Sequence, residues 1–197
     1  MSKVLILIPS RMSAQRLPGK PLLKINNLPV ISHVVKRGQE TGLGEVIVCT
    51  EDKEILQAVE KNGGQAILTG KQHKNGTERI FEVFEKLKKK VDHVISLQGD
   101  EPMINPEDII NLYNFMVKSN SEIGTLASNI TNDLELLNEN VVKVRTEKKL
   151  EENKFVRALS FSRSNLLNEN SYVYHHIGVY CYKISTLRKF VNLKQTT

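Results

Sequence analysis

The chain has 197 residues, 28 lysines and arginines against 22 aspartates and glutamates, a formal charge of +6, two cysteines and no tryptophan. This length can bury the core of one domain without disulfides or a structural metal. The longest early apolar run, residues 4–8, stops at Pro9 and is too short for a signal peptide or a membrane span. We therefore expect a single cytoplasmic domain over residues 1–197, without membrane insertion.

In the first half, short apolar runs alternate with helical patterns, which is typical of a parallel α/β sheet. Strands are predicted at residues 4–8, 45–50, 65–68 and 93–97. Helices are predicted at residues 29–40, 52–62 and 76–90, and another from Asn105, where a capping residue, a proline and two acidic residues stand in order. A polar loop is expected over residues 69–76. Lysines 86 and 88–90 fit the solvated end of the third helix better than a phosphate site.

Beyond residue 120 the pattern changes to separated β-like pieces at residues 125–130, 141–145, 155–161 and 177–182, joined by asparagine-rich connections. We interpret residues 121–197 as a mixed αβ second half of the same domain. Cys49 and Cys181 lack the spacing of a zinc site or a redox pair, so buried free thiols are expected.

A cationic loop is predicted directly after the first strand. Residues 1–39 hold seven lysines and arginines and no carboxylate, whereas the rest of the chain holds 21 cations and 22 carboxylates. Arg11, Arg16 and Lys20 lie where prolines and a glycine prevent a continuous helix, at the carboxyl end of a strand, where open α/β sheets bind ligands. The negative oxygens of a triphosphate would relieve the repulsion among the three cations.

Three other interpretations of this loop stand beside a triphosphate site. A solvated surface loop has the same composition, and a basic chain allows a nucleic-acid partner. A Walker phosphate loop needs glycine at position 14 and serine or threonine at position 21, whereas the chain has Ala14 and Pro21, so this motif is excluded.

The segment 97–102, LQGDEP, follows the strand at 93–97 and brings carboxylates to the same edge of the sheet. Gly99 allows a close approach of the backbone, and Asp100 is a candidate Mg²⁺ ligand, because Mg²⁺ takes one or two protein carboxylates and completes its shell with water and phosphate oxygens. An ordinary acidic turn containing Asp100 and Glu101 is the alternative.

Two further segments carry candidate groups. In residues 75–79, NGTER, Arg79 opposes the dipole of the helix that it opens, which indicates an anion site; an exposed pair with Glu82 is the alternative. In the second half, residues 161–163 (FSR) and 174–182 (YHHIGVYCY) combine cationic, polar and aromatic groups, although paired histidines are more often packed than catalytic.

Taken in order, these motifs resemble those of the 3-deoxy-D-manno-octulosonate (KDO) cytidylyltransferases, or CMP-KDO synthetases. The family patterns I-P-A-R-x-x-S-x-R-L-P-G-K-P-L, H-x-x-G-T-E-R, V-Q-G-D-E-P, V-K-V, F-S-R and R-H-x-G-x-Y-x-Y correspond to residues 8–22, 73–79, 97–102, 142–144, 161–163 and 175–182. The resemblance covers essentially the whole chain. The first and third patterns also occur in other sugar nucleotidyltransferases, whereas the complete set is much more specific.

The resemblance implies a nucleotide-diphospho-sugar transferase fold: a Rossmann-like, three-layer α/β fold with a mainly parallel sheet. It implies the reaction CTP + KDO → CMP-KDO + diphosphate, which serves lipopolysaccharide biosynthesis. Residues 1–120 would form the nucleotide-binding half, and residues 121–197 the sugar-binding and homodimerisation half. The partners would be two small anions rather than a nucleic acid.

The resemblance also implies a role for individual residues. CTP would be bound by Arg11, Arg16, Lys20, Arg79 and Gln98, and the acidic sugar by Gln98, Arg163 and His176. Asp100 would hold Mg²⁺, and Lys20 and Asp100 would be the catalytic residues. The anomeric hydroxyl of KDO would attack the α-phosphorus in line, without a covalent enzyme intermediate.

The chain departs from the family pattern at Ala14 and Gln15, and His175 stands where the family has arginine. Family members continue beyond the position of Thr197 through L-E-Q-L-R and G-V-D-T-P-E-D segments, and the aspartate of the latter completes their metal site. Two alternatives therefore stay open: a cytidylyltransferase for another acidic sugar of the sialic-acid type, and a truncated, inactive nucleotide-binding remnant.

Overall fold

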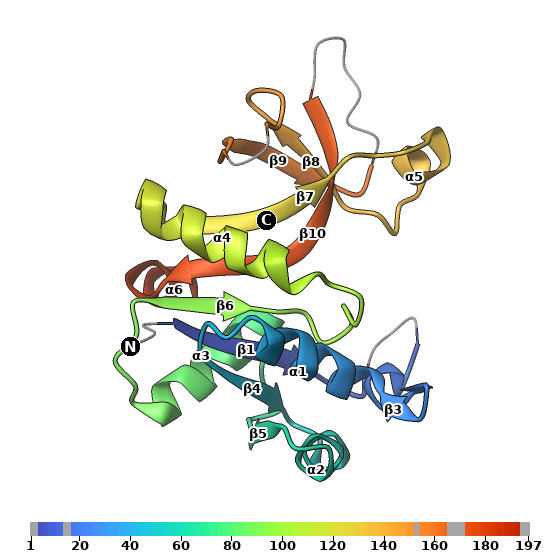
Figure 1. Cartoon of the computed structure of the whole chain (residues 1–197), viewed down its shortest axis with the longest axis vertical. Coiled ribbons are helices and arrows are strands. Elements are labelled where there is room, and N and C mark those ends of the chain that lie inside the picture. The colour runs from blue at the N-terminus through green and yellow to red at the C-terminus, as the bar shows by residue number, and fades with distance from the viewer. Residues whose placement is uncertain (1–3, 14–16, 152–153, 165–171, 194–197) are drawn as a thin grey trace.

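The computed structural model describes residues 4–13, 17–151, 154–164 and 172–193. Its centre is an eight-stranded sheet (Figure 1). Four strands are parallel, in the order β5 (Gln65–Leu68), β4 (Glu45–Thr50), β1 (Val4–Ser10) and β6 (His93–Ser96). The antiparallel strands are β7 (Ile123–Ser128), β8 (Lys143–Thr146), β9 (Ala158–Ser162) and β10 (Tyr172–Lys183). The predicted three-layer α/β fold is confirmed, and its parallel pairs lie in the first half.

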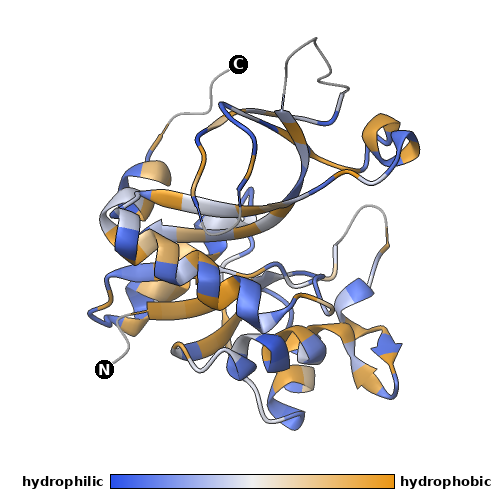
Figure 2. Cartoon of the chain, turned by 45° about the horizontal axis from the view of Figure 1, so that its top comes forward, coloured by the Kyte–Doolittle hydropathy of each residue, from blue (hydrophilic) through white to orange (hydrophobic). Residues whose placement is uncertain are grey.

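Helices cover the sheet on both faces, and β1 is therefore buried on both sides. Val4, Ile6 and Ile8 pack with α1 (Val30–Glu40), α2 (Lys53–Lys61) and α4 (Pro106–Ser119), and Leu5 and Leu7 pack with α3 (Gly76–Leu87) and α6 (Ile184–Phe190). This alternation follows from the two-residue period of a strand. Apolar stretches accordingly follow the central strands in Figure 2.

The two halves are joined through β10, the longest strand. Its residues 180–183 pair with β6, its residues 172–175 pair with β8, and β7 lies along its other side, with a change of register between Ile177 and Tyr180. One sheet therefore runs through both halves (Figure 1). The stretch between the two pairings, residues 176–179, lies beside the carboxyl end of β6.

Most of the predicted elements are confirmed, and the differences have local causes. Helix α3 ends at Leu87 because Lys88 takes a left-handed conformation (φ 50°), so the following lysines lie beyond the helix. Both cysteines are buried free thiols. Among the described helices, none has the length and apolar content to cross a membrane.

Short elements complete the fold. A single turn η1 (Lys20–Leu22) and the hairpin of β2 (Lys24–Ile25) and β3 (Leu28–Pro29) follow the cationic loop. Helix α5 (Asp133–Leu137) projects from the second half, and its start is capped by Asn132, whose Oδ1 accepts a bond from the Glu135 N–H. Neither the hairpin nor α5 was predicted, because each is too short to produce a hydrophobic period.

Candidate active site

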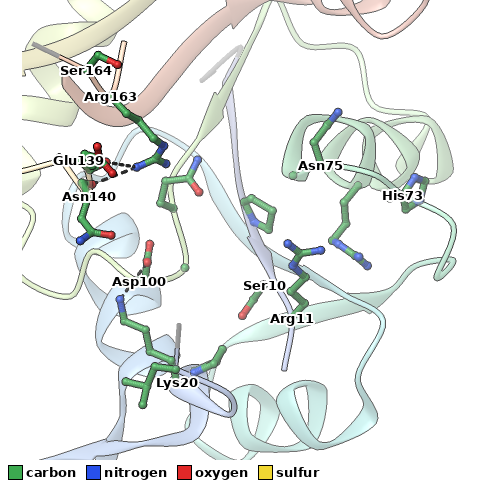
Figure 3. A pocket seen from close by; sticks show the side chains of 17 residues that line it. Ser10, Arg11, Lys20, His73, Asn75, Asp100, Glu139, Asn140, Arg163 and Ser164 are labelled. Carbon is green, nitrogen blue, oxygen red and sulfur yellow. Dashed lines mark hydrogen bonds and ion pairs between the residues drawn. The ribbon is translucent and has the colours of Figure 1, made fainter. Parts of the chain in front are cut away.

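A cavity of about 1110 Å³ opens at the carboxyl ends of β1 and β6 (Figure 3). Segments from both halves of the chain line it. Its polar wall residues are Ser10, Arg11, Lys20, His73, Asn75, Arg79, Gln98, Asp100, Glu139, Asn140, Arg163 and Ser164. Ligand pockets for drug-sized molecules range over about 300–1,000 Å³, so this cavity has room for two small substrates.

Lys20 and Asp100, which both line the cavity, form an ion pair, with Nζ 2.9 Å from Oδ2 (Figure 3). Both groups are partly exposed, with side-chain exposures of 36% and 54%. Such pairs contribute about 0–1 kcal/mol, so a bound anion and cation can separate the two side chains at low cost. The predicted cationic loop and acidic segment therefore lie at the same edge of the sheet.

Gly99 makes this approach possible. A Cβ at this position would lie 2.9 Å from the carbonyl oxygen of Pro9, so any side chain would push the acidic segment away from the end of β1. Hydrogen bonds also anchor the cationic loop that follows β1. The Met12 N–H donates to Asp52 Oδ2 at 2.8 Å, and the Gly19 N–H donates to the Met12 carbonyl. Arg11 is exposed at the cavity wall, whereas Arg16 lies outside the described residues.

Arg79 lines the cavity from the start of α3, and it is 3% exposed. Its guanidinium donates to Glu51 Oε2 at 2.7 Å, to the Thr69 hydroxyl at 2.5 Å and to the Gly70 carbonyl at 3.3 Å. The alternative of an exposed pair with Glu82 is therefore wrong. Much of the hydrogen-bonding capacity of Arg79 is used within the protein, and its contact with a nucleotide stays a prediction.

Glu82 instead anchors the loop at residues 69–76. Burial alone would raise its pKa, but hydrogen bonds from Lys86, His73 and the Gly70 N–H outweigh burial and lower the pKa to about 2. The carboxylate is thus charged at neutral pH and holds His73, a cavity residue, against α3.

Gln98 and Arg163 line the cavity beside the second half of the chain. Gln98 Nε2 donates to the Gly178 carbonyl at 3.0 Å, in the part of β10 that lies between its two pairings. Arg163 follows β9, and its Nη1 lies 3.2 Å from the carbonyl oxygens of both Glu139 and Asn140 (Figure 3). The cations of the first half and Arg163 therefore flank one cavity.

His176 does not line this cavity. It is 9% exposed, its Nε2 lies 2.9 Å from the Thr125 hydroxyl, and its ring contacts those of Phe161 and Tyr180. Burial, with a smaller effect from His175, lowers the pKa of His176 to about 4. The ring is therefore neutral at pH 7 and supplies no charge, and its part in the sugar site stays a prediction.

A family model for cytidylyltransferases matches residues 5–197. The 3-deoxy-manno-octulosonate cytidylyltransferase of Nitrobacter hamburgensis is 40% identical over 194 residues, which are 98% of this chain and 74% of that protein. The enzyme of the same name from Afipia carboxidovorans is 43% identical over 191 residues, 96% of this chain and 76% of that protein. The chain belongs to the 3-deoxy-manno-octulosonate cytidylyltransferase family.

The solved structures agree with this membership. A structure of CMP:2-keto-3-deoxy-manno-octonic acid synthetase complexed with CTP has a TM-score of 0.86 and 37% sequence identity, and the match covers all of this chain and 80% of that one. The fold of this cytidylyltransferase therefore follows that of its relatives over both halves.

The structure adds contacts to this cytidylyltransferase site that the motifs did not indicate. The carbonyl groups of Glu139 and Asn140 bind Arg163, and backbone groups leave no signal in the sequence. Lys143 is fully buried beside them. A lysine between valines at residues 142–144 was the available signal, because a polar residue at an inward position of a strand is unusual.

The residues at the cavity fit a divalent metal that shares its shell with phosphate oxygens. Among the described residues, no group of three or more His, Cys, Asp or Glu side chains could enclose a metal. Asp100 nevertheless offers a hard oxygen ligand at the cavity, and its Oδ2 contacts Lys20 through an exposed pair. Mg²⁺ takes only one or two protein carboxylates beside phosphates, and this donor set suffices for that.

The buried His176 leads to a prediction about stability and pH. A histidine in the unfolded chain has a pKa near 6.5, so between about pH 6.5 and pH 4 the unfolded state binds a proton that the folded state does not. The folded state should lose on the order of 1–2 kcal/mol as the pH falls through this window, allowing for partial exposure. The free energy of unfolding in urea should differ less between pH 7 and pH 5 for His176→Gln than for the wild type. Equal differences would contradict the assignment.

Proposed function

We propose that this protein transfers the cytidylyl group of CTP to KDO and releases diphosphate. The observation that carries the proposal is that Arg11 and Lys20 from the first half of the chain and Arg163 from the second half line one cavity. Both proposed substrates are anions, so cations from both halves of the chain reduce the repulsion between the triphosphate and the sugar carboxylate. The names of the relatives support KDO over another acidic sugar.

The residues suggest how the reaction proceeds. Lys20 and Arg11 would bind the phosphates of CTP, and Arg163 would hold the sugar carboxylate, so that the anomeric hydroxyl of KDO faces the α-phosphorus. The new bond joins that oxygen to the α-phosphorus, the hydroxyl proton passes to solvent, and the bond from the α-phosphorus to the bridging oxygen breaks, so that diphosphate leaves. Most of the catalysis would come from positioning and from cations that stabilise the charge on the phosphate oxygens.

We further propose that Asp100 holds Mg²⁺, which would supply positive charge next to the phosphates when bound. The half-exposed carboxylate at the cavity supports this assignment. Lys20 would then exchange its contact with Asp100 for a contact with phosphate, because ammonium groups bind phosphate oxygens strongly.

Diphosphate release tests the proposed function directly. The 197-residue chain would be mixed with CTP and Mg²⁺, with KDO, with N-acetylneuraminic acid, or without a sugar. We expect release that depends on KDO. Release only with the sialic acid would favour the other acidic sugar, and no release would support an inactive remnant.

A homodimer through the second half is also proposed. Large apolar side chains are exposed there, including Leu134 at 82% on α5, Leu159 at 50% on β9 and Tyr172 at 44% on β10, and α5 is largely apolar in Figure 2. Burying such side chains between two copies would stabilise a dimer. A monomeric mass in sedimentation equilibrium would contradict the proposed homodimer.

The cytoplasmic location stays a prediction.

A further inference from the structure

Lys143 on β8 is a buried cation with unusual partners. The residue is 0% exposed, and its Nζ donates to the carbonyl oxygens of Asn138 and Arg163, each at 2.8 Å. Among the described residues, no carboxylate forms an ion pair with it. Taking an ammonium group out of water costs several kcal/mol, which carbonyl oxygens offset only in part. An apolar side chain would fill this position at lower cost, which indicates that the charge has a use.

The two carbonyl groups that Lys143 binds belong to the segments that form the wall around Arg163. Asn138 follows α5 and begins the turn that continues through Glu139 and Asn140. The carbonyls of Glu139 and Asn140 accept from the guanidinium of Arg163, while the carbonyl of Arg163 accepts from Lys143. Lys143 therefore closes a ring of hydrogen bonds that fixes both the backbone and the side chain of Arg163.

The turn itself is well ordered by local bonds. The Asn138 carbonyl also accepts from the Val141 N–H at 3.0 Å, and the Asn138 side chain accepts from the Asn140 N–H at 2.9 Å. Arg163, by contrast, is exposed, and its described side-chain contacts are those two carbonyls. Without Lys143, no other described contact would tie the backbone of Arg163 to the start of this turn.

We infer that Lys143 is a positioning residue for the acidic sugar: its ammonium group holds Arg163 and the 138–140 turn together, so that the guanidinium is presented to the carboxylate of the substrate. This inference rests on the proposed function, because it takes the sugar carboxylate as the ligand of Arg163. Lys143 does not touch the cavity, and it acts through Arg163 on sugar affinity rather than on CTP affinity.

The test compares binding of the two substrates by calorimetry, with the full chain and with EDTA present to prevent turnover. Lys143→Met keeps the length of the side chain and removes its charge and donors. We expect the Kd for KDO, measured with CTP present, to rise about tenfold or more, because the guanidinium of Arg163 would no longer be held in position for the sugar carboxylate. The Kd for CTP should stay the same. Lys149→Met, which removes an exposed lysine of the same half, is the matched control and should change neither Kd.

A double-mutant cycle separates positioning from a general effect on the fold. Arg163→Met alone should weaken KDO binding, and adding Lys143→Met to it should cause little further loss. Additive losses, or equal losses for KDO and CTP, would overturn the inference. If Lys143→Met shows no cooperative unfolding transition, it is not folded. Lys143→Gln, which keeps N–H donors but removes the charge, then takes its place in the same cycle. No KDO binding by the wild type would refute the proposed function; wild-type KDO affinity in both Lys143 variants would refute the inference alone.

Discussion

Asp100→Asn is expected to lower the rate of diphosphate release from CTP and KDO by at least about 10²-fold, a typical effect of removing one group that stabilises transition-state charge. Asparagine has the shape of aspartate but lacks the negative charge that the proposed Mg²⁺ requires. The loss should appear mainly in kcat and should lessen at high Mg²⁺ concentration. Steady-state rates over a range of Mg²⁺ concentrations measure both effects.

The same substitution should leave stability nearly unchanged. The pair with Lys20 is partly exposed and contributes at most about 1 kcal/mol. Asp108→Asn removes the same charge from an exposed position in the first turn of α4, outside the cavity, and serves as the control. Wild-type rates for Asp100→Asn, or equal losses in the two variants, would contradict the assignment of Asp100.

Glu51→Gln is expected to lower the free energy of unfolding by about 3 kcal/mol, because it leaves the buried guanidinium of Arg79 without a charged partner. The Arg79 side chain is 4% exposed and that of Glu51 is 16% exposed, so water cannot fully replace the lost carboxylate. The bonds of Arg79 to Thr69 and to the Gly70 carbonyl remain, which places the loss at the lower end of the range for buried pairs. Urea unfolding of Glu51→Gln and of the wild type measures this loss of unfolding free energy.

Glu40→Gln provides the matched control for this substitution. Its pair with Arg37 spans 2.9 Å on an exposed face of α1, with side-chain exposures of 50% and 38%. We expect its loss to be below about 0.5 kcal/mol. A loss for Glu51→Gln no larger than that for Glu40→Gln would show that the Arg79 site tolerates an unpaired charge.

The sequence allowed prediction of features that depend on local periods and on the rule that parallel strands end at one edge. The strands β4 and β5 and the meeting of Lys20 with Asp100 follow from these rules. The partner of Arg79 could not be predicted in this way, because Glu51 precedes it by 28 residues and the two meet where α3 packs on the paired strands β4 and β1.

The second half was less predictable for a physical reason. Its strands are antiparallel and are placed by pairing along β10, whose start at Tyr172 precedes the apolar run that was expected at residues 177–182. The neutral state of His176 and the ring of bonds through Lys143 result from packing between separate segments. The neutral state of His176 has no local pattern, and the lysine between two valines marks Lys143 as unusual without showing which groups it binds.

The position of β10 in the chain has a consequence for biosynthesis. On the ribosome, the four parallel strands leave the exit tunnel before β10 is made, and β7 is complete while its partner strand is still missing. The edge of β6 and both edges of β7 then expose unsatisfied backbone groups, which favour pairing with other chains. The nascent protein therefore exposes these strand edges from the time β7 leaves the tunnel until β10 has left it and paired, and it is prone to aggregation during that interval.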